Sequence, residues 1–523
     1  MPFFSFSLIS NSPFSPLLLL LSLLSFFSSI FMKLKKKKMS KLDDNHPPPS
    51  PLKLPIIGNL HQLGRLPHRS LRDLSSHHGP LMLLHLGRIP LLVASSPSAA
   101  REILRTHDNH FADRWSLTAS RIFHYDSRDV AFARYSDYWR EARKAAVIHL
   151  LSSKKVHSYR LAREEEVAAM VERVRRAAAA STAVDVGEEL NVVAMNVSSR
   201  AVVGEPARGS WWGKGLKKLV EDSSSLSAEF FAGDYVPWMG WTGRVSGFLG
   251  RARRAFDEAN GLLDGIVEER RERRKKEKRD EEDECFLDVL LSLEEEMRAR
   301  FKEFDDDCIK AIIKDMVGAG TGSTSAAMEW VMAELIRNPR TMRKLKEEIT
   351  KLVGPPNSEE LRVREEHLAD MIYLKAAIKE ALRLHPPAPL LVPRRLMEDA
   401  IVGGYRVPKG AMTLVNVWAI GRDPDIWDTP DEFQPERFIN GKGGADLDLT
   451  GRDFLVLPFG AGRRACPGIQ FSMMMIELAI ANLVYKFEWK SSKGEEKDTD
   501  MGEAFGLVTR KRGGLLLHAT KAY

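Results

Sequence analysis

The chain has 523 residues, of which 44% are hydrophobic and 28% are charged. These fractions are those of an ordinary globular protein, and they exclude a disordered chain, a collagen-like repeat and a protein that crosses a membrane many times. The net charge is +7, and residues 1–46 contribute +4 of it through a cluster of lysines. Because the remaining residues are almost neutral overall, basicity gives no reason to expect binding to nucleic acid.

The first 32 residues predict a membrane anchor. No charged residue occurs between Phe3 and Met32, and the stretch is rich in leucine. About 20 apolar residues span a bilayer as a helix. The lysines follow this stretch instead of preceding it, which favours a retained anchor over a cleaved signal peptide and places the rest of the chain in the cytosol. We expect residues 33–58, first basic and then rich in proline, to form a hinge before a single catalytic domain over residues 59–523.

Helical periodicity dominates this domain. Residues 305–337 predict a long helix with three aspartates at its amino terminus and Asn338-Pro339 at its end. A second helix is expected at 370–385 and an apolar helix after Pro467. Strands are expected at 81–86, 91–94, 402–408 and 412–417. The predicted fold class is therefore mainly α with a minor β portion (α+β).

The chain has three cysteines, Cys285, Cys308 and Cys466. Such a low, odd number supports no disulfide framework and fits a reducing compartment. Cys285 follows a nearly continuous charged run at 268–284, so we expect an exposed thiol without a function. Cys308 lies near the start of the predicted long helix and is expected to serve packing.

The segment from Phe459 to Gly468 reads Phe-Gly-Ala-Gly-Arg-Arg-Ala-Cys-Pro-Gly and carries the strongest chemical signal. Its glycines allow tight turns and the close approach of a flat ligand. Cys466 stands just before a helix, where the helix dipole favours a thiolate, and Arg464 offers a fork for a carboxylate. No neighbouring cysteine or histidine completes a zinc site. A single thiolate suits the axial position of a haem iron, and the alternative is a structural cysteine in a tight turn.

This decapeptide resembles the haem-ligand loop of the cytochrome P-450 family, whose pattern is Phe-x-x-Gly-x-Arg-x-Cys-x-Gly. The resemblance continues over nearly the whole chain after the anchor: residues 379–383 are similar to the family's Glu-x-x-Arg helix and residues 433–438 to its Pro-Glu-Arg-Phe segment. It implies a P-450-like fold with haem b between the long central helix and the helix after Cys466, and Cys466 as the axial ligand of the iron.

The resemblance also assigns roles to residues outside the cysteine loop. It implies a structural charge cluster of Glu380, Arg383 and Arg437, although an isolated Glu-x-x-Arg is by default a pair at the surface. Haem-binding residues, several of them facing the propionates, are implied at Cys466, Arg464, Phe459, Trp139, Arg143 and Arg394. Buried propionates need such cations because an unpaired buried charge is costly.

Oxygen chemistry is implied on the long helix, where the family pattern is Ala/Gly-Gly-x-Asp/Glu-Thr-Thr/Ser. This chain has Ala-Gly-Thr-Gly-Ser-Thr at 319–324. The resemblance therefore implies catalytic roles for Ala319, Gly320, Ser323 and Thr324. Gly322 replaces the family's acid, and this departure puts the route of proton delivery in doubt. Asp315 is more than one helical turn away, so we do not expect it to act in place of that acid directly.

The departure at position 322 leaves three functions open. The first is a monooxygenase with altered proton delivery, which the retained thiolate, hydroxyl and small residues favour. The second is a haem-thiolate dehydratase or isomerase that uses no dioxygen. The third is a haem-binding protein without catalysis. Product formed under argon without a reductant would favour the second.

The residues of these motifs are similar to those of the plant microsomal A-type group of the family, which acts on terpenoids, phenolics, alkaloids and oximes. Pocket walls are implied at 113–128, 317–323, 388–392 and 504–507, and their composition favours a small apolar substrate. Electrons are expected from NADPH through NADPH–cytochrome P-450 reductase in the endoplasmic reticulum membrane. Candidates for a basic docking face are Arg140, Lys144 and Arg463, for which ordinary solvated cations are the alternative.

Overall fold

The structure is a computed structural model that describes residues 46–276, 284–356, 362–440, 447, 449–492 and 500–522. The predicted anchor over residues 1–32 and the first part of the hinge lie outside these ranges. Within them, no helix combines the length and the apolar character needed to cross a bilayer.

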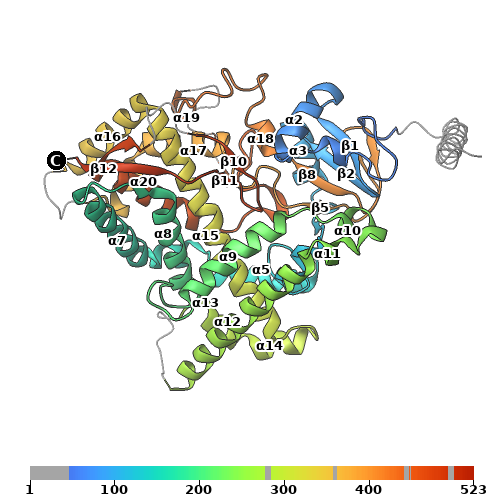
Figure 1. The fold of residues 1–523 in the computed structure, drawn as a ribbon, viewed down its shortest axis with the longest axis horizontal. Coiled ribbons are helices and arrows are strands. Elements are labelled where there is room, and N and C mark those ends of the chain that lie inside the picture. The colour runs from blue at the N-terminus through green and yellow to red at the C-terminus, as the bar shows by residue number, and fades with distance from the viewer. Residues whose placement is uncertain are drawn as a thin grey trace, which may run out of the picture.

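The central element is helix α15 (Asp306–Arg337), which runs through the middle of the helical part of the molecule (Figure 1). The Asp305 side chain caps it by accepting a hydrogen bond from the Cys308 amide at 3.2 Å. The side chains of α15 are buried over most of its length because helices α8 (Val186–Val202), α17 (Ile372–Leu384) and α20 (Ile469–Lys486) pack against it.

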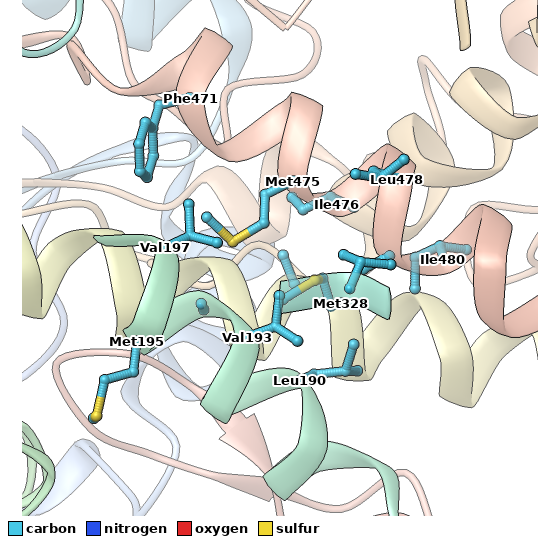
Figure 2. Close-up of a cluster of buried hydrophobic side chains, with 14 of the residues drawn as sticks. Leu190, Val193, Met195, Val197, Met328, Phe471, Met475, Ile476, Leu478 and Ile480 are labelled. Carbon is cyan, nitrogen blue, oxygen red and sulfur yellow. The ribbon is translucent and has the colours of Figure 1, made fainter. Parts of the chain in front are cut away.

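Apolar side chains from α8, α15 and α20 form the main core. Figure 2 shows Leu190 and Val193 of α8, Met328 of α15, and Met475 and Ile480 of α20 meeting between the three helices. Each of these five side chains is almost completely buried. This shared core fixes α15 relative to the amino end of α20, which directly follows the cysteine loop.

The remaining helices surround this core. Those of ten or more residues are α2 (Pro67–His78), α5 (Asp137–His149), α7 (Arg160–Ala179), α9 (Gly213–Ala228), α12 (Phe248–Lys276) and α16 (Pro339–Val353). Shorter helices are α3 (Pro97–Arg101), α4 (Thr118–Phe123), α6 (Ser153–Ser158), α10 (Ala232–Tyr235), α11 (Thr242–Val245), α13 (Phe286–Ser292), α14 (Glu294–Arg300), α18 (Val417–Ile420) and α19 (Arg437–Asn440).

A five-stranded sheet in the order β1-β2-β8-β5-β3 lies at the opposite side of the molecule from β12 (Figure 1). Its strands are β1 (Leu81–Leu86), β2 (Ile89–Ala94), β8 (Met412–Val415), β5 (Arg394–Arg395) and β3 (Asp113–Arg114). The pair β2 and β8 is parallel and the other pairs are antiparallel. There are three smaller sheets among the described residues. In one, β12 (Leu516–Lys521) lies between β4 (Val184–Asp185) and β9 (Phe487–Ser491). The other two pair β6 (Ala400–Val402) with β7 (Tyr405–Val407) and β10 (Glu503–Ala504) with β11 (Arg510–Lys511).

The predicted class, mainly α with a minor β portion, is confirmed, and some element bounds need correction. The strand expected at 402–408 is a hairpin, because Gly403 and Gly404 both adopt positive φ angles, 55° and 82°, and turn the chain between β6 and β7. The strand expected at 412–417 ends at Val415, because the Asn416 side chain caps the short helix α18. The helix expected from residue 370 starts at Ile372, after a 3-10 turn over Glu365–Asp370.

The expectation of an exposed Cys285 is wrong. Its side chain is 4% exposed and lies in the main core. The charged run ends before it, and the apolar helix α13 begins directly after it and carries Cys285 inward. The thiol donates to Asp288, which also pairs with the buried Arg270, and burial raises the pKa of the thiol to about 12. Cys308 is fully buried, in agreement with a packing role.

Candidate active site

A cavity of about 340 Å³ lies between α15 and the loop that precedes α20. Ala319, Gly320, Ser323 and Thr324 of α15 line one side of it. Phe459, Arg464 and Cys466 of the loop line another. The four predicted α15 residues and the cysteine loop are therefore brought to one cavity, although 135 or more residues separate them in the chain.

Backbone hydrogen bonds hold the cysteine loop in place. The Cys466 amide donates to the Phe459 carbonyl at 2.9 Å, and the Ala465 amide donates to the Gly462 carbonyl at 2.9 Å. Gly462 has a φ of 73°, and a Cβ at this position would collide with the carbonyl oxygen of Leu104. Only glycine fits there, and the resulting turn leaves the Cys466 side chain accessible from the cavity.

The Cys466 thiol lies deep in the protein even though it faces the cavity. Burial raises its pKa, and the Gly468 backbone N–H and the Arg143 charge act in the opposite direction. A thiolate at this position therefore needs a bound cation. Within the described part of the chain, no group of three or more His, Cys, Asp or Glu side chains is arranged to hold a metal ion. The residues present fit a haem, for which Cys466 would be the protein's ligand to the iron.

Four arginines form a second conspicuous feature of the cavity wall: Arg114, Arg143, Arg394 and Arg464. Arg464 donates to the carbonyls of Ala112 at 2.7 Å and Ala133 at 2.6 Å, and Arg143 donates to the Ala465 carbonyl at 2.7 Å. Of the four, only Arg394 forms an ion pair with a described residue, Asp108, at 3.1 Å.

The four arginines carry an excess of positive charge that Asp108, Asp113 and Asp129 offset only in part. Burial and then neighbouring Arg394 lower the pKa of Arg464 to about 9, and burial followed by Arg464 lowers the pKa of Arg114. Such a group of buried cations fits a ligand with two carboxylates, as haem has in its propionates. Sequence reasoning missed Arg114 in this group, although it lies within the predicted pocket stretch at 113–128.

Trp139 does not line the cavity. Its indole Nε1 donates to the Val130 carbonyl at 2.9 Å, and its ring lies against the guanidinium of Arg464. The structure thus places Trp139 one layer behind the cavity wall, in contact with an arginine that lines it.

On α15, the Ser323 hydroxyl donates to the Ala319 carbonyl at 2.8 Å. The hydroxyls of Thr324 and Thr321 are buried without a hydrogen-bond partner among the described residues. A Cβ on Gly320 would lie 2.6 Å from the Ser198 hydroxyl, so a larger residue at position 320 would fill this part of the cavity wall. Of these α15 residues, Thr324 both lines the cavity and has no hydrogen-bond partner for its hydroxyl among the described residues.

Position 322, where the family pattern has an acid, faces Arg510 of β11. The Arg510 guanidinium donates to the Gly322 carbonyl at 3.2 Å, and a Cβ at position 322 would lie 3.7 Å from the same nitrogen. Asp315 is two helical turns away, or about 10 Å along the axis. Its carboxylate accepts from the amides of Val130 at 3.1 Å and Ala131 at 2.9 Å.

The walls of the cavity differ in part from those expected. Ala388, Leu391 and Val392 line it as expected, but Arg114 is the sole contribution of the stretch 113–128. The middle of that stretch forms α4, whose Ala119 and Phe123 pack against α12. Of the wall expected at 504–507 only Leu507 lines the cavity, and Val508 and Arg510 line it as well, whereas Phe505 stacks on His68. Sequence reasoning also missed α9, which contributes Leu219, Val220, Ser223 and Ser224.

The predicted structural charge cluster is assembled. Arg383 donates to both carboxylate oxygens of Glu380, at 2.7 and 2.8 Å, and Arg437 donates to Glu380 at 3.1 Å. The side chains of Glu380 and Arg383 are 0% exposed. The cluster lies away from the cavity wall and joins α17 to the segment around α19.

The three basic residues considered for docking are at the surface. Arg140, Lys144 and Arg463 have half or more of their side chains exposed, and each lies beside an acid: Asp137, Glu141 and Asp108, respectively. Their local charge is therefore partly balanced within the chain.

Comparison with known proteins agrees with this architecture. The family model described as cytochrome P450 matches residues 47–518. Cytochrome P450 71A4 of Solanum melongena is 43% identical over 485 residues, which cover 92% of this chain and 94% of that protein. The (+)-menthofuran synthase of Mentha piperita is 42% identical over 486 residues, covering 93% and 95%. Cytochrome P450 71A12 of Arabidopsis thaliana is 42% identical over 468 residues, covering 89% and 91%.

The chain belongs to the cytochrome P450 family of haem-dependent oxidoreductases. Its similarity to plant members confirms the plant group indicated by the motifs.

Proposed function

We propose that this protein is a membrane-anchored haem-thiolate monooxygenase that inserts one oxygen atom from dioxygen into a small, largely apolar substrate of plant specialised metabolism. The observation that carries the proposal is that Cys466 lines the same cavity as Ala319, Gly320, Ser323 and Thr324 of α15. When bound, haem b would supply the activation of dioxygen and the transfer of its oxygen atom.

In this proposal each group of residues has a separate task. Cys466 is the iron ligand, and Phe459 with the loop shields it from water. Arg114, Arg143, Arg394 and Arg464 hold the propionates, and Trp139 orients Arg464. Glu380, Arg383 and Arg437 fix the segment around α19.

The α15 residues handle oxygen and protons. Ala319 and Gly320 would leave space in the cavity for dioxygen, and the hydroxyls of Ser323 and Thr324 would hold or pass on a proton there. With glycine at position 322, water in the cavity replaces the carboxylate of the family pattern.

A single-pass anchor over residues 1–32 in the endoplasmic reticulum membrane and electron supply from NADPH through cytochrome P-450 reductase complete the proposal. The charge order of the amino terminus supports the anchor and a cytosolic catalytic domain. Arg140, Lys144 and Arg463 are exposed cations, and Arg463 belongs to the cysteine loop itself. These charges support docking of an acidic partner at this surface.

The decisive experiment is a reduced carbon-monoxide difference spectrum of the purified protein. We expect the Soret band of thiolate ligation, lost in Cys466→Ala and retained in Cys285→Ala and Cys308→Ala. A colourless protein, histidine-type ligation or an unchanged band in Cys466→Ala would refute the proposal. Turnover with reductase separates the two chemistries: product that requires dioxygen and NADPH supports a monooxygenase, whereas product under argon supports a dehydratase or isomerase.

A further inference from the structure

Arg510 is a charged residue in an otherwise largely apolar part of the cavity. It belongs to β11 in the carboxyl-terminal hairpin, and the same cavity is lined by Leu507 and Val508 of that segment and by Leu219 and Val220 of α9. A guanidinium has five N–H donors. The hydrogen bond to the Gly322 carbonyl is the only one that the Arg510 side chain makes with a described residue.

No acid in the described ranges forms an ion pair with Arg510 within 4 Å. Three glutamates influence its charge from farther away, Glu329 most strongly, followed by Glu221 and Glu188. Glu188 is already bound by Lys217 at 2.5 Å, and Glu221 lies 4.0 Å from the same lysine. Burial lowers the pKa of Arg510 and raises that of Glu329 to about 7, so Glu329 is only partly charged near neutral pH.

The absence of a side chain at position 322 makes this donor available. In the family pattern an acid occupies position 322, and a Cβ there would lie 3.7 Å from the guanidinium nitrogen. A carboxylate at 322 would be within reach of Arg510 and would neutralise it. With glycine, the remaining side-chain N–H groups of Arg510, which lines the cavity, have no hydrogen-bond partner among the described residues.

We propose that Arg510 is the anchor for a carboxylate carried by the substrate, so that the cavity accepts an apolar skeleton with one acidic end. This proposal rests on the proposed function, because it treats the cavity beside α15 as the substrate site. The forked guanidinium binds both oxygens of a carboxylate. The hydrocarbon part is received by the apolar side chains that line the cavity from α9 and the carboxyl-terminal segment: Leu219, Val220, Leu507 and Val508. The low polarity around the pair strengthens this interaction relative to water.

The test compares a carboxylic acid with its methyl ester, since the two share one skeleton and differ in charge. Geranic acid and methyl geranate, and cinnamic acid and methyl cinnamate, are titrated into the haem-loaded protein by isothermal titration calorimetry. The variants are Arg510→Leu, Arg510→Lys and, as a matched control, Arg512→Leu. Arg512 is two residues farther along the chain, its side chain is 69% exposed, and it lies 3.5 Å from Asp500 at the surface.

We expect wild type and Arg512→Leu to bind at least one acid about ten- to a hundredfold more tightly than its ester. Arg510→Leu should lose this preference, and Arg510→Lys should keep part of it. An ester that binds as tightly as the acid to wild type, no measurable binding of either acid, or an unchanged preference in Arg510→Leu would overturn the proposal. The carbon-monoxide spectrum of each variant is recorded separately, so a failure of haem-thiolate ligation is distinguished from a failure of acid recognition.

Discussion

The guanidinium carbon of Arg464 lies 3.8 Å from the ring centroid of Trp139. The indole N–H is in turn bound to the Val130 carbonyl, and Trp139 is 3% exposed. The hydrogen bond to Val130 holds the buried indole in place, and the face of the indole packs against the Arg464 guanidinium. These contacts orient Arg464, which lines the cavity. Helix α5 therefore acts on the cavity through an arginine of the cysteine loop.

Two substitutions of Trp139 distinguish the contribution of its ring face from that of its indole hydrogen bond. Trp139→Phe keeps an aromatic face for Arg464 and loses the N–H donor, whereas Trp139→Ala removes both and leaves a cavity. We expect Trp139→Ala to lower the free energy of unfolding by about 3–5 kcal/mol and Trp139→Phe by clearly less. Thermal denaturation followed by circular dichroism measures the stability, and the ratio of Soret to protein absorbance measures haem retention. Equal losses in the two variants would contradict a role for the ring face.

Local motifs were the part of this site that could be predicted from the sequence. The glycine spacing of the loop predicts the turn at Gly462, and the three-residue spacing of Glu380 and Arg383 predicts their pairing on one helix face. Both features depend on residues that are near each other in the chain. The fold class could also be predicted, because helical and strand periodicity and the family motifs are likewise patterns of residues near each other in the chain.

Residues that tertiary packing brings together were missed. Arg114 of β3 and Arg510 of β11 reach the cavity through sheet pairings and loops that no local pattern encodes. The α9 wall carries ordinary amphipathic periodicity, which does not reveal whether its apolar face meets a core or a cavity. Cys285 was predicted wrongly from its local sequence. The charged run before it indicated an exposed thiol, whereas the apolar helix α13 after it determines its burial.

Removing the charge of the buried Glu380 is expected to lower stability far more than removing the charge of an exposed aspartate. Glu380→Gln leaves Arg383, which is fully buried, and Arg437 without their counter-charge, and we expect a loss of about 3–5 kcal/mol in stability. Asp399→Asn is the control, because Asp399 and its partner Arg406 are both half exposed. Its denaturation midpoint should stay near that of wild type. Similar midpoints for both variants would show that the Glu380 cluster is not a fixed structural element.

Asp315 offers a test of what its carboxylate does in the cavity wall. Burial and the nearby Asp129 charge raise its pKa, so the neutral form is favoured, and its acceptor oxygen serves the Val130 and Ala131 amides. Asp315→Asn keeps an acceptor oxygen and mimics the neutral acid, so we expect little change in stability. Asp315→Ala leaves two buried amides without a partner and should cost about 1–3 kcal/mol. Urea denaturation of both variants at neutral pH checks this; a costly Asn variant would instead indicate that the charged form is required.

Glu329 predicts a pH dependence of stability. It is 5% exposed, and burial raises its pKa to about 7 from an ordinary value of 4.5, although Arg510 and Lys511 act in the opposite direction. Between these two pH values the folded protein holds a proton that the unfolded chain has lost, so the Glu329 contribution to stability falls as the pH rises from 4.5 to 7. Glu329→Gln removes this dependence and should be more stable than wild type at pH 8, by at most about 3 kcal/mol, yet similar to it at pH 4.5.

Melting temperatures at pH 5 and pH 8 measure this difference, with Glu347→Gln, on the exposed face of α16, as the control. The control should shift with pH as wild type does, because an exposed glutamate keeps its hydration in both states. A Glu329→Gln variant with the pH response of wild type would show that the carboxylate is stabilised as an anion in the folded protein. In that case Glu329 would already supply the counter-charge of Arg510, and this would count against Arg510 as the anchor of a substrate carboxylate.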